Sequence, residues 1–265
     1  MIQIIDVNGY CGVWPYWPLR SGDVESILTV MDRIGIDRVC VSSLKAVFTD
    51  PKAGNEEIKK MTRRHPDRFY PALTYSPYAS GKEDYRTDWE NDRSGLIKLF
   101  PLQHTYDPLE EPYAQKLLQF CGEKHIPVMI PYRLMMSWRF PTFDLKKIAA
   151  LVQRFPEVQF IIASINYLSE LQTALHTIQQ YKNVYLETSA MMAFREIEYV
   201  VGQVGADRIL HGSCIPLQNA AIGPLKINKT NISEEAKNRI LYLNAANLLN
   251  RTGHKDNATG SHVKE

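Results

Sequence analysis

The chain lacks three features that would point to a metal, redox or membrane function. Its four cysteines are far apart and form no C-x-x-C pair, which argues against a zinc knuckle or a thiol redox motif. No segment approaches the ~18 consecutive apolar residues of a membrane-spanning helix. The first residues show no charged segment followed by an apolar one, as a secretion signal would. We therefore expect a cytoplasmic protein that does not bind a membrane.

An excess of charge of either sign is also missing. The chain has 31 Lys and Arg against 29 Asp and Glu, a net charge of +2, so neither nucleic acid nor an anionic membrane is expected as a partner. The basic run at 59–64 is expected to lie on the solvated outer face of a helix. A length of 265 residues suits a single α/β barrel of roughly 250 residues.

Short apolar segments alternate with amphipathic ones along the chain, which favours a parallel sheet covered by helices. The expected strands are Ile2–Val7, Arg38–Ser42, Phe69–Leu73, Leu96–Phe100, Val128–Ile130, Gln159–Ala163, Val184–Leu186 and Arg208–Leu210. Their number, and the absence of a glycine-rich phosphate loop after the first strand, favour a TIM-like (β/α)8 barrel over an open doubly wound sheet.

Helices are expected between these strands. Apolar residues follow helical spacing over 24–34 and 145–155, and Ser233 followed by two glutamates is a good N-cap for a closing helix that runs towards Leu249. The interval 75–95 is polar and turn-rich, so a full helix is not expected there. We predict one domain over 1–252 and a disordered tail over 253–265.

Histidines are too few and too scattered for a metal site. Of the seven, only His104 and His211 fall near the carboxyl ends of the predicted strands, where a barrel places its chemistry, and they follow different strands. A catalytic metal needs about three protein ligands, and no His-x-His or H-E-x-x-H motif is present. We expect no metal and no other cofactor, and we expect His211 to pack against a helix.

Several motifs, in order, resemble the amidohydrolase-related barrels, in the branch of aminocarboxymuconate-semialdehyde decarboxylases. The resemblance covers Ile4 to about Leu249 and implies their barrel fold. Gly95–Pro101 matches the family pattern G-x-K-x-x-P, and Asn244-Ala245-Ala246 matches its N-A-A. The segments similar to I-D-x-H-x-H, P-V-x-x-H, I-x-x-H and G-A-D-R-I-L-x-G-S-D-x-P are Ile5–Tyr10, Pro127–Pro131, Ile161–Ser164 and Gly205–Pro216.

The departures from the family fall on its metal-binding positions. The residues that stand where the family has four histidines and a catalytic aspartate are Asn8, Tyr10, Pro131, Ser164 and Cys214. Proline has no side-chain donor and tyrosine is a rare metal ligand. The metal-assisted hydrolysis or decarboxylation that the resemblance implies therefore cannot simply be carried over to this chain.

Lys98 and Cys214 are candidate catalytic residues. Lys98, which is expected to point from the fourth strand towards the centre of the barrel, could bind a substrate carboxylate, act as a base or form a Schiff base; alternatively it forms an internal ion pair with Asp6 or Glu187. Cys214 could be a thiolate nucleophile with His211 as its base; alternatively it is a small residue that fills the place of a missing metal.

Tyr10 is the third candidate catalytic residue, as a general acid or part of an oxyanion site. Neutral polar side chains form a candidate substrate-binding ring with it, or a plug that satisfies its own hydrogen bonds. Arginines and aromatics in two loops suit a pocket for a small, partly apolar anion, or an oligomer contact. The candidate substrate-binding residues are Asn8, Tyr132, Arg133, Ser164, Ser189, Arg139 and Trp14.

Two functions from different classes remain open. The first is a metal-independent hydrolase or lyase that acts on a small organic acid, lactone or amide, with a carboxylate-like ligand in its site. The second is a catalytically silent relative, which serves as a binding protein or as the non-catalytic subunit of a hetero-oligomer with an active relative. Either could form homo-oligomers. An enzyme predicts an open pocket at the barrel mouth, whereas a silent relative predicts a filled one.

Overall fold

The computed structural model describes residues 2–16, 18–19, 22–81, 84–92, 95–135, 137 and 139–250 of the chain. The predicted disordered tail, 253–265, lies outside the described residues. No helix in the described part of the chain is both long and apolar enough to cross a membrane.

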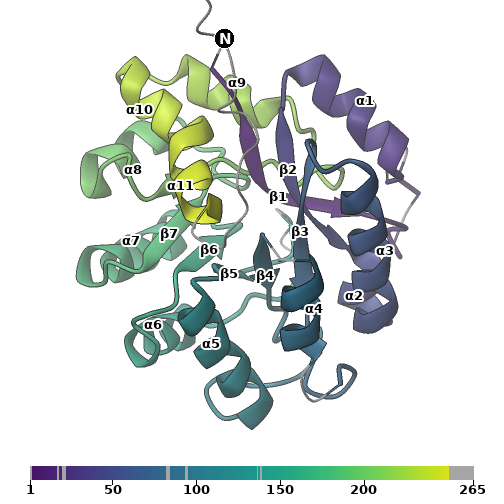
Figure 1. The fold of residues 1–265 in the computed structure, drawn as a ribbon. Coiled ribbons are helices and arrows are strands. Elements are labelled where there is room, and N and C mark those ends of the chain that lie inside the picture. Colours follow the sequence, from purple (N-terminus) through teal and green to yellow (C-terminus); the bar gives the residue numbers. More distant parts are fainter. Residues whose placement is uncertain are drawn as a thin grey trace, which may run out of the picture.

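Eight parallel strands form one sheet in the order β1 to β8 (Figure 1). The strands are β1 (Ile5–Cys11), β2 (Arg38–Ser43), β3 (Phe69–Thr74), β4 (Leu96–Lys98), β5 (Val128–Pro131), β6 (Phe160–Ala163), β7 (Val184–Glu187) and β8 (Ile209–Leu210). Hydrogen bonds from Val7 N to His211 O (3.0 Å) and from Tyr10 N to Ile215 O (2.7 Å) join β1 to the segment after β8. The prediction of a (β/α)8 barrel is confirmed.

Helices follow the strands and surround the sheet (Figure 1). They are α1 (Val24–Ile34), α2 (Leu44–Phe48), α3 (Pro51–Arg64), α4 (Asp84–Asp92), α5 (Pro112–Lys124), α6 (Leu145–Arg154), α7 (Leu168–Gln180), α8 (Glu196–Val204), α9 (Ile222–Lys229), α10 (Glu234–Asn238), the π-helical turn η1 (Arg239–Leu243) and α11 (Asn244–Asn250). The Ser233 side chain accepts a hydrogen bond from Ala236 N (3.1 Å), which confirms the predicted N-cap of the closing helix.

The helix α4 was not expected from its polar sequence. Ion pairs with α3 hold it against the rest of the barrel. The ammonium of Lys59 on α3 lies 2.7 Å from a carboxylate oxygen of Asp88 on α4, and it also pairs with Glu56. Arg63 pairs with Asp92 at 2.6 Å one turn further along both helices. Lys59 is buried by these contacts, so the prediction that the whole basic run lies on a solvated face is wrong at this residue.

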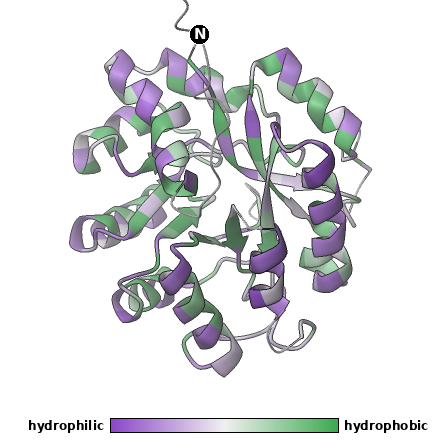
Figure 2. Ribbon diagram, viewed as in Figure 1, coloured by the Kyte–Doolittle hydropathy of each residue, from purple (hydrophilic) through white to green (hydrophobic). Residues whose placement is uncertain are grey.

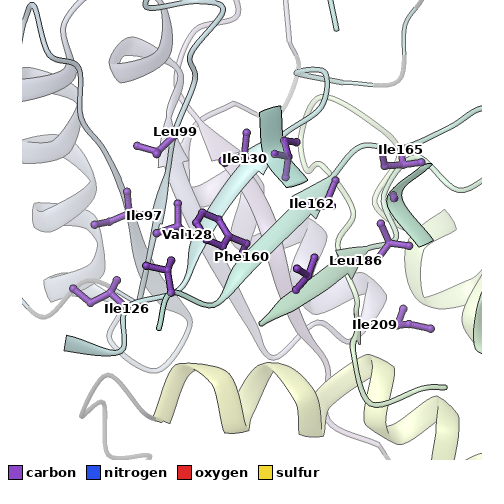
Figure 3. Close-up of a cluster of buried hydrophobic side chains, with 14 of the residues drawn as sticks. Ile97, Leu99, Ile126, Val128, Ile130, Phe160, Ile162, Ile165, Leu186 and Ile209 are labelled. Carbon is purple, nitrogen blue, oxygen red and sulfur yellow. The ribbon is translucent and has the colours of Figure 1, made fainter. Parts of the chain in front are cut away.

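Apolar residues fill the space between the sheet and the surrounding helices. Val128, Phe160 and Leu186 come from the adjacent strands β5, β6 and β7 and belong to one buried cluster (Figure 3). Around the barrel, the helices carry both hydrophobic and hydrophilic residues (Figure 2), as expected for helices that cover a sheet with one side.

Two further apolar clusters lie at the two ends of the barrel interior. The first, at the amino-terminal end, includes Leu96 at the start of β4 and is completed by Ala245 and Leu249 from α11. The second covers the carboxyl ends of the strands, and we call it the mouth cluster. Its buried members are Tyr10, Trp14, Leu44, Val47, Phe100, Leu134, Met135, Cys214 and Leu217.

Candidate functional site

A cluster of polar side chains lies between these two apolar layers, at the carboxyl ends of the strands. Lys98 and Glu187 end β4 and β7, and Ser164 and Cys214 follow β6 and β8, where barrel enzymes place catalytic groups. Asp6 and Asn8 lie within β1. All of them are fully buried. The members of this polar cluster are Asp6, Asn8, Lys98, Ser164, Glu187 and Cys214, with Tyr10 directly above them.

Lys98 lies at the centre of the polar cluster. Its ammonium donates to Asn8 Oδ1 and to Gly9 O, both at 3.0 Å, and lies 4.2 Å from the ring centre of Tyr10. Burial lowers the pKa of Lys98 from 10.5 to about 8, although nearby acidic groups oppose the shift. The Tyr10 ring and two oxygens therefore enclose an ammonium that has no contact with solvent.

The carboxylate of Glu187 holds the opposite side of the cluster. It accepts hydrogen bonds from Asn8 Nδ2 (3.2 Å), Ser164 N (3.2 Å) and the Ser189 hydroxyl (2.8 Å). Ser189 N also donates to it. Burial raises the pKa of Glu187, while the bonds from Ser189 lower it. These four donors use most of the acceptor capacity of the carboxylate.

Asp6 is equally occupied by local donors. Its carboxylate accepts from Asn8 N (2.9 Å), from Ser213 N (3.1 Å) and from the Ser213 hydroxyl. Lys98 therefore makes its hydrogen bonds to neutral oxygens, and the alternative of a direct ion pair with Asp6 or Glu187 is not what the structure has. The charges interact only at longer range.

Cys214 and His211 do not form a nucleophile and base. The Cys214 sulfur accepts from Asn8 Nδ2 at 3.7 Å and lies 3.7 Å from Leu134 O, and burial raises the pKa of its thiol to about 12. The His211 ring is buried without a hydrogen-bond partner, against Gly223 of α9, and burial lowers its pKa to about 4. The packing role expected for His211 is confirmed, and the paired thiolate is not.

One hydroxyl group of the polar cluster and one beside it have no hydrogen-bond partner. These are the phenol of Tyr10 and the side chain of Ser164, both fully buried. Burial, together with the nearby Cys214 and Glu187, raises the pKa of Tyr10 well above its usual value, so the phenol stays protonated. Ser164 and Cys214 also have left-handed backbone angles, with φ of 61° and 60°, which the surrounding packing must hold.

The mouth cluster separates these polar groups from solvent. Trp14 packs against Phe48 and Phe140, with ring centres 5.6 Å apart in both pairs, and Tyr10 lies 6.5 Å from Phe100. Trp14 thus belongs to the cover and not to the wall of an open pocket.

The predicted anion-binding residues in the loop after β5 lie outside the polar cluster. Arg133 forms a buried ion pair with Glu170 on α7, and its guanidinium lies 5.1 Å from the ring centres of Tyr132 and Tyr167. Glu170 also accepts from the backbone nitrogen of Tyr167. Arg139 is exposed. To bind a ligand carboxylate, Arg133 would have to break its ion pair with Glu170.

Sequence comparison identifies the family. The profile of the family described as Amidohydrolase matches residues 10–251. The chain belongs to the amidohydrolase family. The resemblance predicted from the motifs is thereby confirmed, and most of the chain is covered. No curated protein matches this amidohydrolase-family chain in sequence.

Solved structures with the same fold include two decarboxylases and a hydratase. The 2,6-dihydroxybenzoate decarboxylase from Rhizobium is 16% identical, covers 94% of this chain and 99% of its own, and has a TM-score of 0.74. The 4-oxalomesaconate hydratase from Rhodopseudomonas palustris is 17% identical, with 95% and 97% covered and a TM-score of 0.70. The 5-carboxyvanillate decarboxylase from Novosphingobium aromaticivorans, with manganese, is 12% identical, with 94% and 96% covered and a TM-score of 0.74. At these identities the similarity concerns the fold.

The donor set of this family member does not fit a divalent metal ion. Across the described stretches of the chain, no group of three or more His, Cys, Asp or Glu side chains could hold one. A divalent cation bound to Asn8 Oδ1 would approach the ammonium of Lys98, which lies 3.0 Å from that oxygen. At a separation of about 4 Å, the repulsion between charges of +2 and +1 is roughly 8 kcal/mol for an effective dielectric constant near 20.

Two residues that support the site were not predicted. Lys226 on α9 donates to the backbone oxygens of Thr188 and Met191 and so fixes the loop after β7. Nothing in its local sequence distinguishes it from a surface lysine. Gly212 leaves room for Glu187, since a β-carbon there would lie 1.9 Å from Glu187 Oε1. A glycine two residues after a strand is a signal that could have been used.

Proposed function

We propose that this amidohydrolase-family protein is catalytically silent and acts as a binding protein or as the non-catalytic subunit of an assembly. One observation carries the proposal: the polar cluster is fully buried, and its charged members hydrogen-bond to neutral side chains and to the backbone. The catalytic groups of a barrel enzyme must reach a substrate. Here neither Lys98 nor Cys214 has any surface open to solvent, which is the filled mouth expected of a silent relative.

The cost of opening the mouth supports the same proposal. Phe100, Leu134 and Leu217 of the mouth cluster are buried above the polar cluster. Burying a side chain of this size stabilises a protein by about 1.5–3 kcal/mol, so exposing all three would cost roughly 5–9 kcal/mol. That is comparable to the whole stability of a typical domain, about 5–15 kcal/mol. A substrate would have to supply this free energy on binding.

We also propose that the protein performs no metal-assisted reaction. One set of assays tests for catalytic activity and for a bound metal. Purified protein is incubated with 2,6-dihydroxybenzoate, with and without MnCl2, and carbon dioxide release and the melting temperature are measured. We expect no release above the buffer and no rise in the melting temperature. Turnover, or stoichiometric manganese or zinc in elemental analysis of the purified protein, would contradict the proposal.

An enzymatic function that uses Lys98 is the second candidate, and one observation favours it. With a pKa of about 8, about a quarter of the Lys98 side chains are neutral amines at pH 7.5. A neutral lysine can attack a carbonyl carbon and form an imine with loss of water. The unpartnered hydroxyl groups of Tyr10 and Ser164 would then be available to the bound carbonyl compound.

Reductive trapping separates the two candidates. The protein is incubated with pyruvate and sodium cyanoborohydride, and the adduct is located by peptide mass spectrometry. A silent protein leaves Lys98 unmodified, while surface lysines react slowly in both the wild type and a Lys98→Met variant. Fast labelling of Lys98 in the wild type would establish the enzymatic candidate in place of the silent one.

A further inference from the structure

A polar cleft of about 540 Å³ lies between α3 and α4, among the helices that surround the barrel. Both helices are coloured largely as hydrophilic in Figure 2. The side chains of α3 that carry charge into the cleft recur about once per helical turn, so they share one face of the helix. They are Lys52, Glu56, Lys59 and Arg63. Three of these four are basic, so the α3 wall of the cleft is positively charged.

The opposite wall, on α4, is acidic. Asp84, Asp88 and Asp92 follow one another at intervals of four residues and line the cleft. Thr87 and Asn91 are exposed on the same wall and add neutral polar groups. The acidic wall repels a ligand with only negative charge, such as phosphate, and the basic wall repels a polyamine. The cleft therefore suits a small ligand that carries one charge of each sign.

The two walls pair with each other in one half of the cleft. Lys59 lies 2.7 Å from a carboxylate oxygen of Asp88, and Arg63 lies 2.6 Å from one of Asp92. Because the partners advance by four residues in the same direction on both helices, α3 and α4 run parallel to each other. The amino-terminal turns of both helices therefore face the other half of the cleft.

In that half, a cation and an anion line the cleft without an ion pair. Lys52 lies in the first turn of α3 and Asp84 in the first turn of α4. Neither forms a salt bridge with any residue in the described part of the chain. The Asp84 carboxylate accepts a hydrogen bond from Gly81 N at 2.7 Å, which leaves most of its acceptor capacity unused. Lys52 is exposed, so its ammonium can reach a ligand.

We propose that this cleft binds a small zwitterion of the α-amino acid class, with its carboxylate at Lys52 and its ammonium at Asp84. Such a ligand continues the series of ion pairs between α3 and α4 by one more turn and leaves the existing pairs intact. Thr87 and Asn91 would offer hydrogen bonds to a polar ligand side chain. The inference goes beyond the proposed function, because the cleft uses no residue of the polar cluster.

Calorimetric titration of the full chain tests this site. The probes are L-serine and L-glutamine, together with the amide and the N-acetyl derivative of each, which keep only the ammonium or only the carboxylate. The test variants are Lys52→Gln and Asp84→Asn. The matched controls are Lys60→Gln on α3 and Glu90→Gln on α4, because both residues are exposed and neither lines the cleft. Circular dichroism confirms that each variant is folded.

We expect at least one of the two amino acids to bind the wild type and both controls with a Kd below about 10 mM. Each test variant, and each derivative with a single charge, should bind at least about 10-fold more weakly, because one charge-assisted contact is lost. The inference is overturned if neither amino acid binds the wild type, or if the test variants bind as tightly as the controls. An amide that binds as tightly as its amino acid would also refute a site for a zwitterion.

Discussion

The buried ammonium of Lys98 gives this protein a stability that depends on pH in a defined way. Its pKa falls from 10.5 to about 8 on folding because burial disfavours the charged form. The unfolded chain then keeps this proton at pH values where the folded chain has lost it. The free energy of unfolding therefore rises with pH between about 8 and 10.5. With these two pKa values, the rise between pH 7.5 and pH 9.5 is about 2 kcal/mol.

A Lys98→Met variant isolates this contribution. Urea unfolding of the wild type and the variant at pH 7.5 and pH 9.5 gives four free energies of unfolding. Other titrating groups act on both proteins alike, so the wild type should gain about 2 kcal/mol more than the variant over this range. The exposed Lys60, replaced by Met, serves as the control and should follow the wild type. If Lys98→Met shows the same gain as the wild type, the buried and depressed ammonium is refuted.

Two further predictions concern packing and charge. Gly212→Ala should cost at least about 1–3 kcal/mol of stability, because its β-carbon would lie 1.9 Å from Glu187 Oε1. Gly202→Ala in α8, with no atom within 4 Å, should instead gain about 0.5–1 kcal/mol, and urea unfolding that ranks the two alike would contradict this. Arg133→Met should cost about 3 kcal/mol by leaving the Glu170 carboxylate unpaired, and adding Glu170→Gln should restore part of that loss if the ion pair is the cause.

The strands could be predicted because apolar residues in a buried parallel strand follow a regular pattern. All eight predicted segments contain an observed strand or overlap one. The largest difference is at β1, which was expected to end at Val7 and runs to Cys11. The reason is Gly9, which lies within the observed strand. A β-carbon there would lie 2.3 Å from Val39 Cγ1, so the glycine permits the close approach of β2 and the strand continues.

The sequence could predict which residues gather in the polar cluster, because the topology of a barrel decides it. It could not predict which of these residues form hydrogen bonds with each other. Because parallel strands end at the same rim, Asn8, Lys98 and Ser164 could be expected to lie close together. Asn8 bonds to Lys98 directly, and Asn8 and Ser164 N both donate to Glu187. Which groups bond to which depends on side-chain geometry across long sequence separations. Arg133 pairs with Glu170, 37 residues away on α7, and no local sequence pattern predicts that partner.

The closing helix also bears on how the chain can be made. Ala245, Leu248 and Leu249 of α11 pack against Ile5 and Leu96, at the amino-terminal end of the barrel interior. During synthesis, the first strands leave the ribosome long before α11, whose residues cover the amino-terminal end of the barrel interior. We call this end the apolar floor of the barrel. A nascent chain that stops short of Asn244 exposes that apolar floor, so chaperones should hold it until the last turns emerge.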